Sequence, residues 1–206
     1  MAGIFVNDKP VCGGAFIRND HVITAADCVH GKTNIVVSVN SVKPNEMEKK
    51  NVKNFYVHPY YRPSLKGYNV AVVKVDPFPD PVILKLSNVD PKPGQVLLTS
   101  SWNPESEEQR FESEESIVVE RSICKKSLSS QIKINGKLIC MNMENTKFPF
   151  FNGNPLTFVD PDDDDIKILF GIGTYSVENS TERKNLPNVY VNVANMEIDS
   201  FLQTFV

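Results

Sequence analysis

Short apolar runs rich in β-branched residues constrain the fold of this chain more than any other feature of its sequence. Clear runs lie at 35–39 (IVVSV), 70–75 (VAVVKV), 95–99 (QVLLT) and 166–170 (IKILF). Each is bounded by Pro, Gly, Asn or Asp, a pattern typical of short strands joined by turns. The 14 prolines and the Asn135-Gly136 dipeptide supply further turn signals. The sequence therefore predicts an all-β protein.

The one helix that the sequence predicts lies at the C-terminal end, over 195–206. Its apolar residues recur at helical spacing and form one stripe. Asn195 is suited to cap its N-terminus, because a short amide side chain accepts a hydrogen bond from the first turn. The stripe consists of Ile198, Phe201, Leu202, Phe205 and Val206.

Two proline-rich stretches, 76–81 and 90–94, are typical of connecting chain. They divide the strands into two comparable groups within a single domain, 1–206. We expect a first barrel in 1–85 and a second in 95–193. Two packed six-stranded antiparallel β-barrels followed by the C-terminal helix satisfy this pattern, and periodicity alone equally allows a β-sandwich.

Length, composition and charge exclude several classes of function. The chain has 206 residues, 41% of them hydrophobic and 23% charged, as in ordinary globular proteins. Its net charge of −3 argues against nucleic acid as a partner, because binding phosphates needs a concentrated basic face. No apolar run is long enough to span a membrane. The first residues lack the charged start and apolar stretch of a signal peptide.

The cysteines bear on the compartment in which the protein works. There are 4 of them, an even number without a C-x-x-C pair, which indicates disulfides rather than a zinc or thioredoxin-like redox site. Because disulfides persist in oxidising compartments, we expect an extracellular, secreted protein. Asn179, in an Asn-Ser-Thr triplet, is a candidate glycosylation site.

Several segments carry recognisable motifs in a fixed order. They are VCGGAFI at 11–17, ITAADC at 23–28, HPYY at 58–61 with YNVAVVKV at 68–75, NPL at 154–156, and GIGTYS at 171–176 with PNVYVNV at 187–193. The first two resemble the strand that opens the first barrel of chymotrypsin/trypsin-like serine proteases and the T-A-A-H-C motif of that family. The third resembles H-P-x-Y followed by N-D-I-A-L-L-K-L, and the fourth resembles the end of G-D-S-G-G-P-L. The last resembles G-I-V-S-W-G followed by P-G-V-Y-T-R-V. The resemblance covers nearly the whole chain except the family's mature N-terminal segment, and it implies the two-barrel fold.

The resemblance also implies how the cysteines pair. Cys12 is expected to bond to Cys28, and Cys124 to Cys140, across the intermediate loop of the second barrel. Each bridge closes a loop of about 15 residues and is worth roughly 3 kcal/mol in the chain-entropy account. Two other bridges that are common in the family have no counterpart here.

By the same resemblance, Asp27, Asn69 and Asn152 occupy the positions of the family's catalytic histidine, aspartate and serine. In the family the serine hydroxyl attacks a peptide carbonyl, the histidine takes its proton, and the aspartate fixes the histidine tautomer. An amide is no nucleophile, and a carboxylate with an ordinary pKa of about 3.9 is a far weaker base than imidazole at about 6.5. Loss of a triad costs on the order of 10⁶ in turnover, so the resemblance implies an inactive protease.

Positions around the triad depart from the family as well. Phe150 stands where a glycine offers its N–H to the oxyanion. Phe151 stands where an aspartate receives the new N-terminal amine after zymogen cleavage. Thr146 falls near the base of the specificity pocket, which implies no preference for Arg or Lys, and Ser176 adds a side chain where the family has glycine.

The histidines and the carboxylate at Asp27 have structural explanations that we favour over chemical ones. His21, His30 and His58 are expected to have no catalytic role. A cation at Asp27 is not expected, because an isolated carboxylate is more often solvated or bonded to an amide. We therefore expect no metal and no cofactor.

The charged runs are expected to be solvated surface. The acidic run 160–165 predicts a hairpin loop, with docking of a basic partner or weak Ca²⁺ binding as the alternative. The glutamate-rich stretch 105–115 is expected to be disordered. Basic residues near the second cysteine pair predict a solvated face; they are Lys125, Lys126, Lys133 and Lys137.

Three functions of different classes remain open from the sequence. The first is a secreted, inactive serine protease homologue that binds proteins, as cofactor, decoy or inhibitor in an extracellular proteolytic cascade of the innate-immune type. Its partners would be proteases or other cascade components, and a monomer is the default state. The second is a residual enzyme that uses Asp27 on a non-peptide substrate. The third is a degenerate or structural secreted protein without a specific partner.

Overall fold

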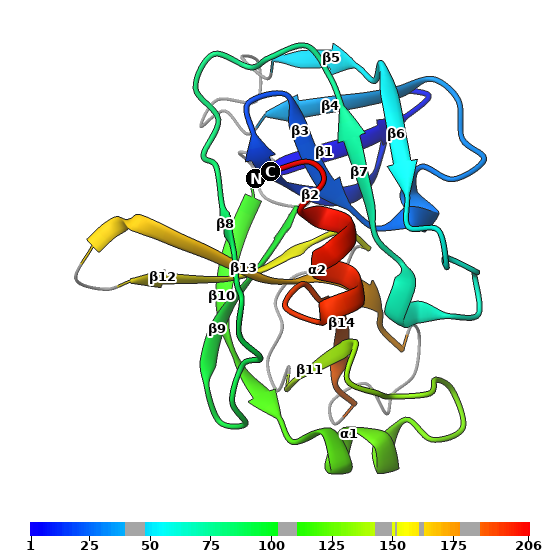
Figure 1. Ribbon diagram of the computed structural model, residues 1–206, viewed down its shortest axis with the longest axis vertical. Coiled ribbons are helices and arrows are strands. Elements are labelled where there is room, and N and C mark those ends of the chain that lie inside the picture. Colours follow the sequence, from blue (N-terminus) through cyan, green and yellow to red (C-terminus); the bar gives the residue numbers. More distant parts are fainter. Residues whose placement is uncertain (40–47, 103–110, 143–149, 151, 161–162, 178–185) are drawn as a thin grey trace.

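The computed structural model describes residues 1–39, 48–102, 111–142, 150, 152–160, 163–177 and 186–206, with side chains at 102, 111 and 163–166 left undescribed. Two β-sheets, each curled on itself, lie against one another, and a helix packs across them at the C-terminal end (Figure 1). The first sheet contains β1 (Ala2–Val6), β2 (Lys9–Arg18), β3 (His21–Thr24), β4 (Ile35–Val39), β5 (Lys49–Asn51), β6 (Asn54–Val57) and β7 (Ala71–Lys74).

The first sheet is a closed six-stranded barrel, because β5 and β6 are two halves of one extended segment. The strand order is β5-β4-β1-β2-β3-β7-β6. At the junction of the two halves the backbone switches partner: Val52 N–H donates to Ile35 O on β4 (3.0 Å), and Lys53 N–H donates to Lys74 O on β7 (2.9 Å). A single strand that pairs with both ends of the sheet leaves no free edge.

The second sheet closes through a direct pairing of its end strands. It contains β8 (Lys85–Leu86), β9 (Val96–Trp102), β10 (Phe111–Val119), β11 (Leu138–Asn142), β12 (Pro155–Asp160), β13 (Asp163–Tyr175) and β14 (Asn188–Asn192). The order is β12-β9-β10-β11-β14-β13, and β12 pairs with β13 to complete the ring. The very short β8 adds to β13 in parallel, outside the ring. The predicted fold of two six-stranded barrels is therefore confirmed, and the sandwich alternative is wrong.

Two expectations about local structure are wrong. A second helix, α1 (Arg121–Ser127), was not predicted; it is short and has only Cys124 buried, so it carries no apolar stripe that a sequence pattern could reveal. The expected disorder over 105–115 does not hold for 111–115, which belongs to β10 and pairs with β9 from Phe111 to Ile117. Pairing with a neighbouring strand can hold a glutamate-rich segment in a sheet, although its composition alone predicts disorder.

The acidic run and the terminal helix also differ in extent from prediction. Residues 163–165 belong to β13 rather than to the hairpin loop. The helix, α2, spans Met196–Leu202, and the Asn195 side chain accepts from Glu197 N–H as expected for its cap. Beyond the helix, Phe205 still packs on the core, but Val206 is 59% exposed, so the predicted stripe ends one residue early.

The main hydrophobic core joins the two barrels. Besides the interior of the first barrel, it includes Leu169 and Val191 from the second barrel and Ile198 from α2. Because the barrels share buried residues, their relative position is fixed by the core.

No helix in the described part of the chain is long and apolar enough to cross a membrane.

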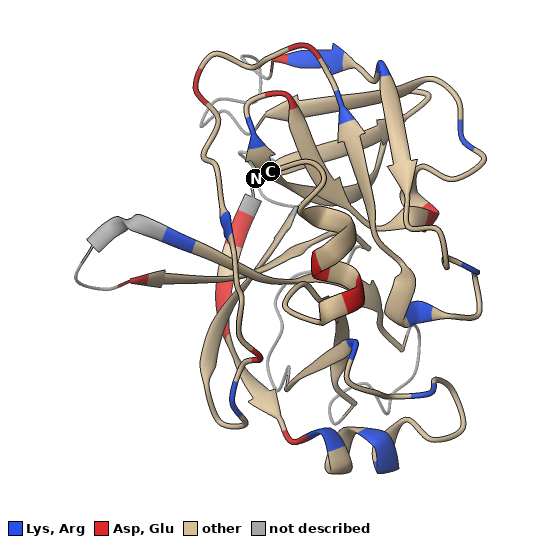
Figure 2. Ribbon diagram, in the orientation of Figure 1, with Lys and Arg blue, Asp and Glu red and all other residues tan. Residues whose placement is uncertain are grey.

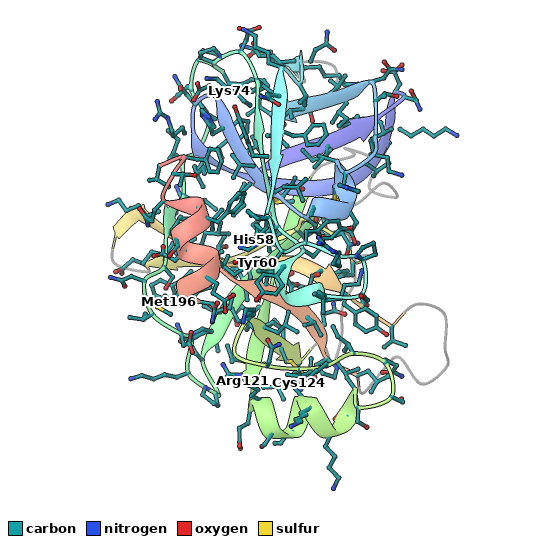
Figure 3. The ribbon with its side chains drawn as sticks, turned by 45° about the vertical axis from the view of Figure 1, so that its right-hand side comes forward. His58, Tyr60, Lys74, Arg121, Cys124 and Met196 are labelled. Carbon is teal, nitrogen blue, oxygen red and sulfur yellow. A yellow bond between two sulfur atoms is a disulfide. The ribbon has the colours of Figure 1, made fainter. Side chains whose placement is uncertain are left out.

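Polar side chains from three parts of the chain meet at the N-terminal end of α2, and Figure 3 shows one of them, His58, next to this helix. The Glu197 carboxylate accepts hydrogen bonds from the Tyr68 hydroxyl (2.6 Å) and from Lys137 Nζ (2.7 Å). These bonds hold the pKa of Glu197 below its ordinary value. His58 lies in the same cluster: its Nδ1 accepts from Tyr60 N–H (3.1 Å), and its Nε2 lies 3.3 Å from Glu197 O.

His58 is therefore set up as a neutral imidazole with an acceptor at Nδ1. Burial lowers its pKa, with Lys137 acting in the same direction and Glu197 opposing. The unfolded imidazole binds a proton at about pH 6.5, so between that pH and the lower folded pKa the unfolded state holds more protons. The free energy of unfolding contributed by this group is thus present at neutral pH and is lost as the pH falls below about 6.5.

We predict that His58→Gln reduces the pH dependence of stability. Wild type should lose unfolding free energy between about pH 7.5 and 5.5, and the variant should lose less, because glutamine takes up no proton. Urea unfolding at several pH values measures this difference. His30→Gln, at an exposed histidine, is the matched control and should keep the wild-type slope; equal slopes in all three proteins would contradict the assignment.

Candidate functional site

The structure brings Asp27, Asn69 and Asn152 together from both barrels. Asp27 lies in a single 3-10 turn (Ala26–Cys28) that the Cys12–Cys28 disulfide fixes to β2. Asn69 directly follows another such turn (Lys66–Tyr68), and Asn152 lies in the turn before β12. The sequence predicted that these positions converge, although they are far apart along the chain.

Asn69 is the buried centre of a hydrogen-bonded network. Its side-chain oxygen accepts from Asp27 N–H (3.0 Å), and its amide nitrogen donates to Thr174 Oγ1 (2.9 Å). The Thr174 hydroxyl in turn donates to Lys66 O (3.2 Å). Asn69 is 0% exposed and Thr174 is 1% exposed. A buried amide with both ends satisfied is held in one orientation and contributes to stability rather than to reactivity.

The Asp27 carboxylate is the only charged group among the three residues. Its Oδ2 accepts from Asn152 Nδ2 (3.3 Å) and from Lys66 Nζ (3.3 Å). Its Oδ1 is buried and has no hydrogen-bond partner among the described residues. Burial, with a contribution from Asp27, raises the pKa of the nearby Tyr61 hydroxyl. Sequence reasoning missed Lys66, because a lysine between Leu and Gly carries no signal that distinguishes a site residue from a solvated one.

The described residues around these three side chains include no histidine bonded to them and one hydroxyl. In the portion of the chain that the structure describes, no histidine hydrogen-bonds to Asp27, Asn69 or Asn152. The one hydroxyl in the network, on Thr174, already donates to a backbone carbonyl. No group of three or more His, Cys, Asp or Glu side chains in the described residues is arranged to hold a metal ion. The group consists of two amides, Asn69 and Asn152, and the Asp27 carboxylate, which is linked to Lys66.

The turn that carries Asn152 is clamped between the barrels. Gly13 N–H donates to Asn152 O (3.0 Å), Gly153 N–H donates to Gly173 O (2.8 Å), and Gly173 N–H donates to Asn154 O (2.8 Å). Gly153 has φ +82°, and a Cβ built on it would lie 2.1 Å from Gly13 O. Only glycine fits at this position, because it tolerates both the positive φ and the close approach of the facing backbone.

The other predicted residues fall in several places. Phe150 is half-buried and packs edge-on against Tyr190 in the core of the second barrel, with ring centroids 5.6 Å apart. Phe151, Thr146 and Asn179 lie outside the described residues. Both disulfides that the resemblance implies are present, Cys12–Cys28 and Cys124–Cys140.

Comparison with known proteins adds a common family and fold. A model of the trypsin family matches residues 1–197. Mouse granzyme B(G,H) is 27% identical over 50% of this chain and 46% of its own length. The Drosophila melanogaster protein named inactive serine protease scarface is 29% identical over 47% of this chain and 16% of its own length. The matched stretches thus span half or less of these curated relatives.

Solved structures resemble nearly the whole chain. Mouse neuropsin, a serine protease, superposes with a TM-score of 0.77 at 19% identity, over 98% of this chain and 92% of its own. A scabies mite inactivated protease paralogue superposes with a TM-score of 0.78 at the same 19% identity and the same coverage, 98% and 92%. At this identity the similarity concerns the fold.

We predict that Gly153→Ala destabilises the protein far more than a matched glycine substitution. Gly94 has the same φ of +82° but nothing within 4 Å of a built Cβ, so Gly94→Ala should cost only the backbone strain of about 1 kcal/mol. Gly153→Ala adds a clash with backbone and should cost about 3 kcal/mol more. Urea unfolding of the two variants compares these costs. Equal losses would show that the clamp relaxes freely around a methyl group.

Proposed function

This chain belongs to the trypsin family of serine proteases, and from that premise we propose that it is a catalytically inactive member that acts by binding other proteins. The observation that carries the proposal is the hydrogen-bonded group of Asp27, Asn69 and Asn152. By the resemblance of the sequence, these residues take the positions of the family's histidine, aspartate and serine, and the hydrogen bonds that join them support this assignment. A peptide bond placed there would meet an amide where a nucleophile is required.

The site also lacks a proton-transfer route. A general base must lie within hydrogen-bond reach of the proton that it removes. At Asp27 the reachable oxygen, Oδ2, already accepts from Asn152 and from the Lys66 ammonium group. The amide of Asn152 has no proton that this carboxylate could take at neutral pH. The group is therefore a static polar network, which supports a scaffold role.

The proposed setting is extracellular. The Cys12–Cys28 and Cys124–Cys140 disulfides favour an oxidising compartment. We infer that the partners are proteases or other components of an extracellular proteolytic cascade, for which this protein would serve as cofactor, decoy or inhibitor. The names of the scarface protein and of the mite paralogue describe them as inactive, which supports the view that this fold is used without catalysis.

We predict no hydrolytic activity from the folded protein. A fluorophosphonate probe, which reacts with activated serines, should not label it, and a broad peptide library should remain uncleaved, because no hydroxyl stands at Asn152. An active trypsin assayed in parallel shows that probe and library work. Asn152→Ala is the matched variant and should behave as wild type. Labelling or cleavage that is present in wild type and absent in Asn152→Ala would overturn the proposal.

The binding role has its own test. Affinity capture with chemical cross-linking, from extracellular fluid of the source organism, should recover a stoichiometric protein partner. A disulfide-bonded protein of similar size and charge serves as the control bait. Capture of nothing beyond that control would contradict the binding role and favour a protein without specific partners, while leaving the absence of catalysis intact.

A further inference from the structure

A cavity of about 350 Å³ opens on the second barrel and shares no residue with the site at Asp27. It lies where the connecting segment 90–93 crosses the ends of β10 and β11 at the start of α1. Apolar groups from the connecting segment and the two strands line it, together with the polar side chains of Asp90, Glu120 and Arg121. The apolar groups include Pro91, Pro93, Val119, Leu138 and Ile139. A volume of this size is in the range that binds a small ligand or a large side chain.

The walls of the cavity are fixed before any ligand arrives. Cys140 itself lines the cavity, and its disulfide to Cys124 ties α1 to β11 (Figure 3). Val119 pairs with Cys140 in the β10–β11 ladder. On the other side, Asn192 Nδ2 donates to Asp90 Oδ1 (2.6 Å), which holds the connecting segment in place. A preformed cavity avoids the entropic cost of ordering its walls on binding.

The carboxylates at the rim already have partners. Asp90 accepts from Asn192 and lies 3.6 Å from Arg121 through its other oxygen. Glu120 accepts a hydrogen bond from the Ser122 hydroxyl (2.5 Å). Both carboxylates keep their charge, but they are outnumbered by the basic side chains around the cavity, Lys92, Arg121, Lys125, Lys126 and Lys133.

Unlike Asp90, the lysines around the cavity have no charged partner among the described residues. Lys92 stands between the two lining prolines, and Lys125 follows Arg121 by one helical turn on the same face of α1, about 6 Å along the axis. Lys126 on α1 and Lys133 after it add further basic residues, and much of the ribbon of α1 is blue in Figure 2. All four lysines are exposed, and within the described residues none makes an ion pair. Exposed unpaired cations on a chain of net charge −3 mark a surface suited to an acidic ligand.

We propose that this surface, the cavity with the exposed Lys92 and Lys125 beside it, is a docking site for an acidic protein segment that inserts one large apolar side chain. The apolar lining provides the anchor pocket, and the lysines on both sides meet acidic residues before and after the anchor. A polyanion without an apolar group would use only the cations and would leave the cavity unfilled. The proposal holds whether or not the site at Asp27 is inactive.

The experiment measures binding of a fluorescent nine-residue peptide in which one phenylalanine is flanked on each side by acidic residues. We expect saturable binding that weakens with salt. Replacing the phenylalanine by serine in the peptide should weaken binding at least about tenfold, since the anchor is then lost. Lys125→Glu should weaken it about five- to tenfold. Lys9→Glu, at an exposed lysine of β2 in the first barrel, is the charge-matched control and should change affinity less than about twofold.

A third variant, Val119→Phe, fills the cavity from within and should abolish anchoring while leaving the lysines in place. If this variant does not fold, the serine-substituted peptide still tests the cavity with the unaltered protein. Absence of saturable binding, or equal binding of both peptides, would overturn the proposal. So would tight binding of a sulfated heparin fragment that Lys125→Glu weakens, if the peptide itself does not bind.

Discussion

The clamp on the turn at 152–154 is the constraint on which the rest of the structure depends. Its backbone is bonded to Gly13 of the first barrel on one side and to Gly173 of the second barrel on the other. Within the first barrel, Thr24 also donates its hydroxyl to Gly13 O (2.6 Å). A Cβ at 153 would collide with this backbone, which shows that the two barrels meet at van der Waals distance. That contact sets the position of Asn152 opposite Asp27.

The group that forms at this meeting point is stabilised by the hydrogen bonds among its members. Asn69 has both ends of its amide bonded, and Thr174 uses its hydroxyl within the network. The Asp27–Lys66 pair, with each side chain about a quarter exposed (27% and 25%), is screened by water and contributes at most about 1 kcal/mol. Reactive sites in proteins usually hold a group under strain or with a shifted proton affinity. Here the buried network is satisfied except for one oxygen of Asp27.

The fold thus separates two kinds of surface. Around Asp27 the polar groups are mostly bonded to one another, so this region serves the packing of the barrels. Around the second-barrel cavity the walls are fixed by the Cys124–Cys140 disulfide, while the lysines outside make no ion pair with any residue that the structure describes. A rigid, solvent-facing cavity with free charges is better placed to meet another molecule than a closed network is.

The sequence by itself determined the strand-forming segments, the cap at Asn195, and, through the family resemblance, the cysteine pairs and the positions to which Asp27, Asn69 and Asn152 correspond. These follow from residue type and short spacing, or from motifs shared with a family. Only the tertiary structure decided how the strands pair, that β5 and β6 close the first barrel as one strand, and that Lys66 and the cavity at Val119 lie where they do. Strand alternation shows which face of a strand is buried but not which strand lies beside it. Contacts such as Asn152 to Asp27, 125 residues apart in sequence, arise only when distant segments pack together.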